Sequence, residues 1–156
     1  MEKKKYLISA CLAGHKCRFD GQAKPVSKIQ KLVERGEAVL VCPEVDGGLS
    51  TPRPASEIVT EDGKIKVVTK TGRDVTDEFR KGAQVSLEKA RQHGASVAIL
   101  KAKSPSCGYG KIYDGTFSGK LVDGNGLTAD LLSENGLSIY SELNFESEGD
   151  IGESQG

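Results

Sequence analysis

The sequence predicts an α/β fold: a mostly parallel sheet in a Rossmann-like or flavodoxin-like order, with helices on both faces and a small β-hairpin insertion. Three observations predict it. Short, continuous apolar runs, which are typical of strands covered on both faces, alternate with segments of helical periodicity. A glycine follows each predicted helix, where helices commonly end. An Asp-Gly pair separates two runs of alternating polarity, as in a hairpin.

The first elements predict one βαβ unit. Apolar strands are expected at about residues 5–10 and 38–42. Between them, Ser27 and Gln30 have the S-x-x-Q spacing of a capping box, which predicts a helix that continues to Arg35. The connection between the two parallel strands is then expected to be right-handed.

A hairpin is predicted at residues 57–69, because alternating apolar residues flank a turn at 61–63. We expect this hairpin to be inserted at the edge of the sheet. The preceding segment, 42–54, contains three prolines and a Gly-Gly pair, so no regular structure is expected there.

The second half of the chain continues the alternation of helix and strand. The longest helix is expected at about 75–93, where apolar residues recur every three or four positions. A strand follows at about 96–101, then a helix at 127–134 and a last strand at 137–142. The glycine-rich, polar segment 111–126 is too long for a simple connection, so we interpret it as a functional loop.

The bulk properties predict a single domain at 1–145 and an acidic, disordered tail at 146–156. The 156 residues include 22 Lys and Arg and 22 Asp and Glu; the formal net charge of zero argues against nucleic acid as a partner. The sequence shows neither an apolar run of membrane-spanning length nor a signal-peptide pattern, which predicts a cytoplasmic location and no membrane partner. No oligomeric state is predicted.

Three cysteines, Cys11, Cys42 and Cys107, each follow a predicted strand. Because ligands bind beyond the carboxyl ends of parallel strands, the fold would bring these thiols to one edge. In a reducing compartment such thiols favour metal binding or catalysis, and thiolates suit zinc or an iron–sulfur cluster. A cubane held by only three thiolates would keep one iron open for a substrate atom. The alternatives are a structural zinc site and ordinary core packing.

The fourth cysteine, Cys17, is near Cys11 in sequence, but their spacing is not that of a C-x-x-C site. We interpret Cys17 as a thiol that is not a ligand. The alternatives are a redox partner of Cys11 and a fourth ligand in a resting state.

Three motifs, in order along the chain, resemble the family long called DUF523. They are SACLAGHKCRFDG at 9–21, CPEVDGGLSTPR at 42–53 and LKAKSPSCG at 100–108. The resemblance extends to about Leu143, so it covers nearly the whole chain except the acidic tail. The characterised member of this family is a bacterial thiouracil desulfidase.

The resemblance implies both a cofactor and a reaction. It implies a [4Fe–4S] cluster held by Cys11, Cys42 and Cys107, whose open iron would bind the sulfur of a thiolated pyrimidine. The family's catalytic glutamate follows the cysteine of the C-P-E motif, which places it at Glu44. Its catalytic serine is the first of S-P-S-C, which places it at Ser104. In the implied reaction, water replaces sulfur at the ring carbon without net redox change, and hydrosulfide leaves.

The residue chemistry is consistent with these roles, and each role also has a simpler alternative. The Glu44 carboxylate could accept a proton from the attacking water, or form an ion pair with Arg53 or Arg18. Ser104 could hold the water or the ring edge, or only stabilise a turn before proline. For the whole chain, the alternative function is an iron–sulfur or zinc-binding sensor or structural module without desulfidase activity.

Overall fold

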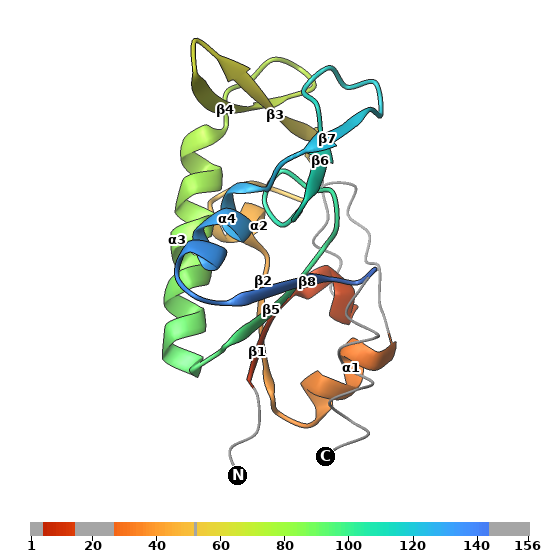
Figure 1. The fold of residues 1–156 in the computed structure, drawn as a ribbon, viewed down its shortest axis with the longest axis vertical. Helices are drawn as coiled ribbons and strands as arrows, with labels where there is room; N and C mark the ends of the chain where they lie inside the picture. The colour runs from red at the N-terminus through yellow and green to blue at the C-terminus, as the bar shows by residue number, and fades with distance from the viewer. Residues whose placement is uncertain (1–4, 15–26, 52, 144–156) are drawn as a thin grey trace.

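The computed structural model describes residues 5–14, 27–51 and 53–143, and its centre is a four-stranded parallel sheet (Figure 1). The strand order is β2-β1-β5-β8, with every neighbouring pair parallel. The four strands in chain order are thus arranged 2-1-3-4, which is flavodoxin-like rather than Rossmann-like. Their bounds are β1 (Tyr6–Ser9), β2 (Ala38–Val41), β5 (Val97–Leu100) and β8 (Ser138–Ser141).

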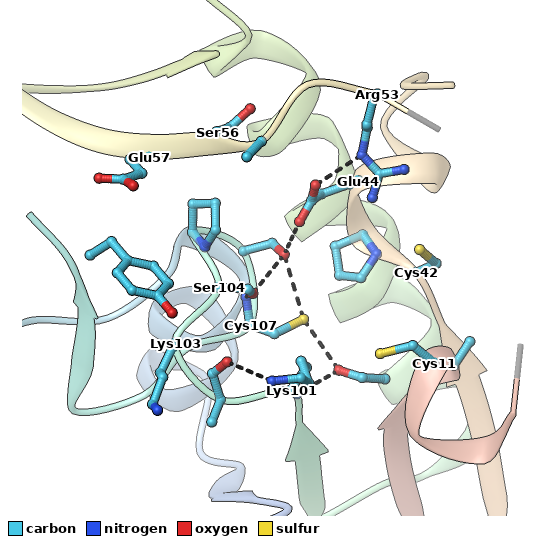
Figure 2. A pocket seen from close by; sticks show the side chains of 18 of the residues that line it. Cys11, Cys42, Glu44, Arg53, Ser56, Glu57, Lys101, Lys103, Ser104 and Cys107 are labelled. Atoms are coloured by element: carbon cyan, nitrogen blue, oxygen red, sulfur yellow. Dashed lines mark hydrogen bonds and ion pairs between the residues drawn. The ribbon is translucent and has the colours of Figure 1, made fainter. Parts of the chain in front are cut away.

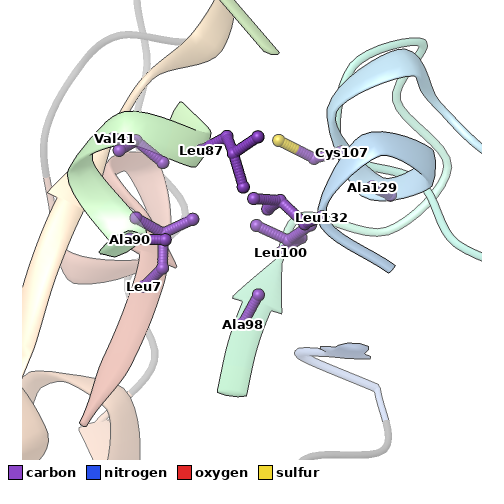
Figure 3. Packing of buried hydrophobic residues seen from close by; sticks show 9 residues of the cluster. All are labelled: Leu7, Val41, Leu87, Ala90, Ala98, Leu100, Cys107, Ala129 and Leu132. Carbon is purple, nitrogen blue, oxygen red and sulfur yellow. The ribbon is translucent and has the colours of Figure 1, made fainter. Parts of the chain in front are cut away.

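Helices cover both faces of this sheet, as predicted. On one face lie α3 (Thr76–His93) and α4 (Leu127–Glu134). They pack on the sheet through a cluster of buried residues: Leu7, Val41, Leu87, Ala90, Ala98, Leu100, Cys107, Ala129 and Leu132 (Figure 3). On the other face lie α1 (Ser27–Glu34) and the 3₁₀ helix η1 (Ala10–Ala13). Their cluster is Ile8, Cys11, Leu12, Ile29, Leu32, Val97 and Ile99.

The predicted hairpin is present, but its predicted position at the sheet edge is wrong. Strands β3 (Ser56–Glu61) and β4 (Lys64–Thr69) form an antiparallel pair of their own. The turn residues Asp62 and Gly63 have φ of 51° and 75°, as a tight hairpin turn requires. The pair lies beyond the carboxyl ends of the parallel strands (Figure 1). A third cluster fixes it there: Ile58, Val67, Val75, Phe79 and Ile112.

Two segments predicted as irregular contain short regular elements. The segment 111–126 includes an antiparallel pair, β6 (Lys111–Tyr113) and β7 (Leu121–Asp123). The segment 42–54 includes a one-turn helix, α2 (Pro43–Asp46). A proline excludes the interior of a helix but is tolerated in its first turn, where the missing N–H has no helical partner. Pro43 is in that position.

The helix α2 packs backbone to backbone on α3. A Cβ on Gly82 would lie 1.8 Å from the carbonyl oxygen of Pro43, and one on Gly47 would lie 1.9 Å from that of Glu78. Only glycine permits this approach. The contact fixes the residues of α2 relative to the longest helix of the fold.

Among the described residues, no helix has both the length and the apolar character needed to cross a membrane. The predicted tail at 146–156 and Cys17 lie outside the described residues. The cytoplasmic location and the single-domain boundary stay predictions.

Candidate active site

A cavity of about 460 Å³ lies beyond the carboxyl ends of β1, β2 and β5. All five residues predicted for the site line it: Cys11, Cys42, Glu44, Ser104 and Cys107 (Figure 2). Cys11 is in η1 directly after β1, Cys42 directly follows β2, and Cys107 is in the turn after β5. The parallel sheet therefore brings together residues that are distant in sequence, at the edge where ligands bind in such folds.

The three cysteines all line the cavity, with Cys11 and Cys107 buried and Cys42 half-buried. No disulfide joins any of them to another. Within the described part of the chain, no three His, Cys, Asp or Glu side chains are gathered closely enough to hold one metal ion. A single zinc needs its thiolates about 2.3 Å from one centre, whereas a cubane binds each thiolate at a different iron. Thiolates are the usual ligands of iron–sulfur clusters, so the donor set fits a cluster held by three cysteines.

Cys107 is held in a buried, hydrogen-bonded environment. Burial raises the pKa of the Cys107 thiol to about 11. The hydroxyls of Ser9 and Ser106, 3.3 and 3.6 Å from Sγ, lower this pKa, while Glu44 and Cys42 raise it. A metal bound at this sulfur would hold it as the thiolate, since a coordinating thiol is deprotonated by its metal.

Glu44 is the second residue of α2, and both of its oxygens are engaged. Arg53 donates from Nε to Glu44 Oε1 at 3.0 Å, and both side chains are largely buried. Ser106 donates from Oγ to Glu44 Oε2 at 3.0 Å. The ion pair with Arg53, given above as an alternative role, is thus present in a residue that also lines the cavity. The other possible partner, Arg18, lies outside the described residues.

Ser104 stabilises the turn that carries Cys107. Its Oγ accepts the backbone N–H of Cys107 at 2.7 Å and lies 3.2 Å from the Oγ of Ser106. The turn role expected for a serine before proline is therefore present, and the same hydroxyl lines the cavity.

The family model of 2-thiouracil desulfurase matches residues 6–144, which is most of the chain. The chain belongs to this family. It is 48% identical to the uncharacterized protein YbbK of Bacillus subtilis (strain 168), over 87% of this chain and 94% of YbbK. Among solved structures it is similar to the [4Fe-4S]-dependent thiouracil desulfidase TudS, with a TM-score of 0.88. That similarity has 42% identity and covers 99% of this chain and 100% of the TudS chain.

In this family member, three hydrogen-bonding residues of the site were not predicted. Ser106 links Ser104 to Glu44. Ser9 contacts the sulfur of Cys107. Glu57, on β3, accepts the N–H groups of Gly115 and Phe117 at 2.9 and 3.1 Å. The motif S-P-S-C contains two serines, but which of them faces Glu44 depends on the turn and not on the spacing.

The contacts of Glu57 give the glycine-rich segment 111–126 a place in the site. They hold the loop between β6 and β7 against the hairpin β3–β4. Tyr113, Phe117 and Gly119 of that segment line the cavity. The aromatic residues of the cavity lining, Tyr113 and Phe117, therefore come from a segment whose length alone had suggested a functional role.

Proposed function

We propose that this chain is a [4Fe–4S]-dependent desulfidase that replaces the sulfur of thiouracil, or of a related thiolated pyrimidine, with oxygen from water. One observation carries the proposal: three thiols from three strand ends and the Glu44 carboxylate line one cavity. The cavity's volume of about 460 Å³ is within the usual range for small-molecule sites. Membership of the 2-thiouracil desulfurase family supports the same reaction.

Cys11, Cys42 and Cys107 would hold the cluster. When bound, a cluster with three protein ligands supplies an open iron, a Lewis acid suited to a soft sulfur atom. Each thiol follows a strand that is fixed in the sheet ladder, and the turn of Cys107 is held by its own N–H bond to Ser104. This rigidity limits the ordering cost of placing substrate and water.

Glu44 would accept the proton of the attacking water. Its carboxylate is fixed from one side by Arg53 and from the other by Ser106, so its orientation does not have to be selected during the reaction. An ionised carboxylate only accepts hydrogen bonds, so the Ser106 hydrogen points to Glu44. Ser104 then donates to Ser106, because Ser106 has no second hydrogen. The result is a directed chain from Ser104 through Ser106 to Glu44.

The reaction balances without an external reductant. Water provides the oxygen for the ring carbon, the carbon–sulfur bond breaks, and hydrosulfide leaves. The Ser104 hydroxyl would hold the water or the ring edge, and the chain through Ser106 would connect that position to the carboxylate. General-base assistance of this kind typically contributes about 10²–10⁴-fold to a rate.

The test is anaerobic purification, assay of iron and acid-labile sulfide, and then addition of 2- or 4-thiouracil while hydrosulfide is followed. We expect about four irons and four sulfides per chain. Glu44→Gln should retain the cluster and lose about 10²–10⁴-fold in sulfide release. The matched control is Glu78→Gln, which removes the exposed ion pair with Arg73 and should retain activity.

Two outcomes would contradict the proposal. Zinc in place of iron, under anaerobic and iron-replete expression, would identify a structural site. A complete cluster without sulfide release from either thiouracil would favour a sensor or a different thiolated substrate.

A further inference from the structure

Ser9 is the last residue of β1, and it also lines the cavity. It is only 3% exposed, yet it has a polar side chain in an otherwise apolar strand. Its Oγ contacts two groups on different segments: the Sγ of Cys107 at 3.3 Å and the backbone N–H of Lys101 at 2.9 Å.

The number of hydrogens fixes the direction of both contacts. A serine hydroxyl has one hydrogen to donate and two lone pairs to accept with. The N–H of Lys101 can only donate, so the Ser9 oxygen accepts there. The Ser9 hydrogen remains for Cys107, and a thiolate at that position can only accept it.

The other serine near this sulfur cannot take over the same role. Ser106 Oγ is 3.6 Å from the Cys107 sulfur, but it is 3.0 Å from Glu44 Oε2. Its single hydrogen is directed to the ionised carboxylate, which is the stronger acceptor. Of these two hydroxyls, Ser9 is therefore the one that donates to Cys107.

The backbone N–H that orients Ser9 is itself held in place by a neighbouring ion pair. Lys101 is ion-paired through Nζ to Glu142 Oε2 at 3.0 Å, and Glu142 Oε1 accepts the N–H of Ala102 at 2.7 Å. The Glu142 side chain is 7% exposed. This pair fixes the backbone at residues 101–102, and with it the N–H that orients Ser9.

We propose that Ser9 is a positioning residue that tunes the cluster through a hydrogen bond to the Cys107 thiolate. The inference rests on the proposed function, because it requires Cys107 to be a cluster ligand. Hydrogen bonds to cluster sulfurs are one of the factors that set the reduction potential, and a donor stabilises the more negative, reduced state. By drawing electron density from the sulfur, the same bond would make the irons better acceptors for a substrate sulfur.

The test measures the reduction potential and the resonance Raman spectrum of the anaerobically purified protein and its variants. In Ser9→Ala the potential should become more negative and iron–thiolate bands should move to higher frequency. Sulfide release should fall severalfold. Ser9→Thr keeps a hydroxyl and should restore the wild-type potential and bands.

The matched control is Ser86→Ala. Ser86 is also a fully buried serine, but its hydroxyl donates to the Gly82 carbonyl within α3. This variant should keep the wild-type potential and bands, because the hydroxyl that it loses is bonded to a carbonyl within α3 and not to a cysteine. An equal shift in Ser86→Ala would overturn the inference, since the effect would then be a general loss of packing.

A Ser9→Ala protein with an intact cluster and unchanged potential and bands would also overturn it, while leaving the desulfidase function in place. If Ser9→Ala loses its cluster, the hydrogen bond is tested instead in the resonance Raman spectrum of the wild-type protein. A deuterated Ser9 hydroxyl should shift an iron–thiolate band in D₂O, and the absence of that shift would contradict the bond. A wild-type chain that binds no iron would instead overturn the proposed function, and the inference with it.

Discussion

The buried hydroxyl of Thr128 shows what one polar atom costs at the scale of a residue. Among the described residues, Thr128 Oγ1 is the one buried side-chain oxygen or nitrogen without a hydrogen-bond partner. An unsatisfied buried polar group costs about 1–3 kcal/mol. Thr128→Val keeps the shape of the side chain and removes the hydroxyl. We therefore expect it to raise the free energy of unfolding by about 1 kcal/mol, measured by urea denaturation.

Thr76 is the matched control for this prediction, because it is a buried threonine whose hydroxyl is used. Its Oγ1 donates to Asp74 Oδ1 at 2.5 Å and accepts the N–H of Val67 at 2.9 Å. Thr76→Val should lower the free energy of unfolding by about 1–3 kcal/mol. Equal destabilisation by both substitutions would mean that Thr128 has a partner after all.

The dependence of a hydroxyl on its partners also explains which site residues could be predicted from the sequence. Cysteines that follow predicted strands are visible because strand position and residue type are both local features, and the family resemblance of the C-P-E motif adds Glu44. Ser106 and Ser9 were missed because a hydroxyl's role depends on its partners. Those partners come from turns and from strands that are distant in sequence. The available signal for Ser9 was a serine at the end of an apolar strand, directly before Ala10 and Cys11.

At the scale of elements, the contact between α2 and α3 decides where Glu44 lies. In an open helix, Gly→Ala would stabilise by about 1 kcal/mol. At Gly82 the new Cβ would meet the Pro43 carbonyl oxygen at 1.8 Å, and a backbone atom cannot rotate away. We expect Gly82→Ala to destabilise the fold by about 1–3 kcal/mol, as overpacking commonly does, and to reduce sulfide release by displacing α2.

Two measurements test this prediction: the thermal unfolding midpoint and sulfide release per cluster. Gln84→Ala is the control, because Gln84 is an exposed position of the same helix and should change neither quantity greatly. A more stable Gly82→Ala protein with full activity would show that α2 can move without consequence for the site.

Element prediction succeeded where a pattern was long and failed where it was short. The periodicity of the 18-residue helix α3 and the Asp-Gly turn of the hairpin gave clear signals. The three-residue strands β6 and β7 are too short to show an alternation. The four-residue helix α2 begins at a proline, which was interpreted only as a breaker. The place of the hairpin was missed because it depends on the cluster around Phe79, a long-range contact.

For the whole molecule, the fold class could be predicted because alternating strands and helices have few arrangements. The flavodoxin-like order needed the structure, since strand neighbours depend on which helix covers which face. The position of the site followed from the same order. Strands β2, β1 and β5 are neighbours in the sheet, so the cysteines that follow them meet at one end of the sheet.

The last prediction concerns removal of the cluster from the whole molecule. Both faces of the sheet have their own buried clusters, which consist mainly of aliphatic side chains. The apo protein should therefore keep its secondary structure, unlike a zinc finger, whose fold requires its metal. A ligand that binds only the folded state raises stability, so chelation should lower the unfolding midpoint. In a chain of this size, each 1 kcal/mol of lost stability lowers the unfolding midpoint by about 2–4 °C.

Hydrogen exchange would locate the effect. We expect faster exchange in apo protein at 42–47 and 101–108, the segments that carry two of the cysteines, and unchanged protection in β1 and β5. The reason is that the strands are held by the sheet ladder and both clusters, while the two segments would lose the bridge between them. Global loss of protection on chelation would instead show that the cluster, and not the hydrophobic core, holds this fold together.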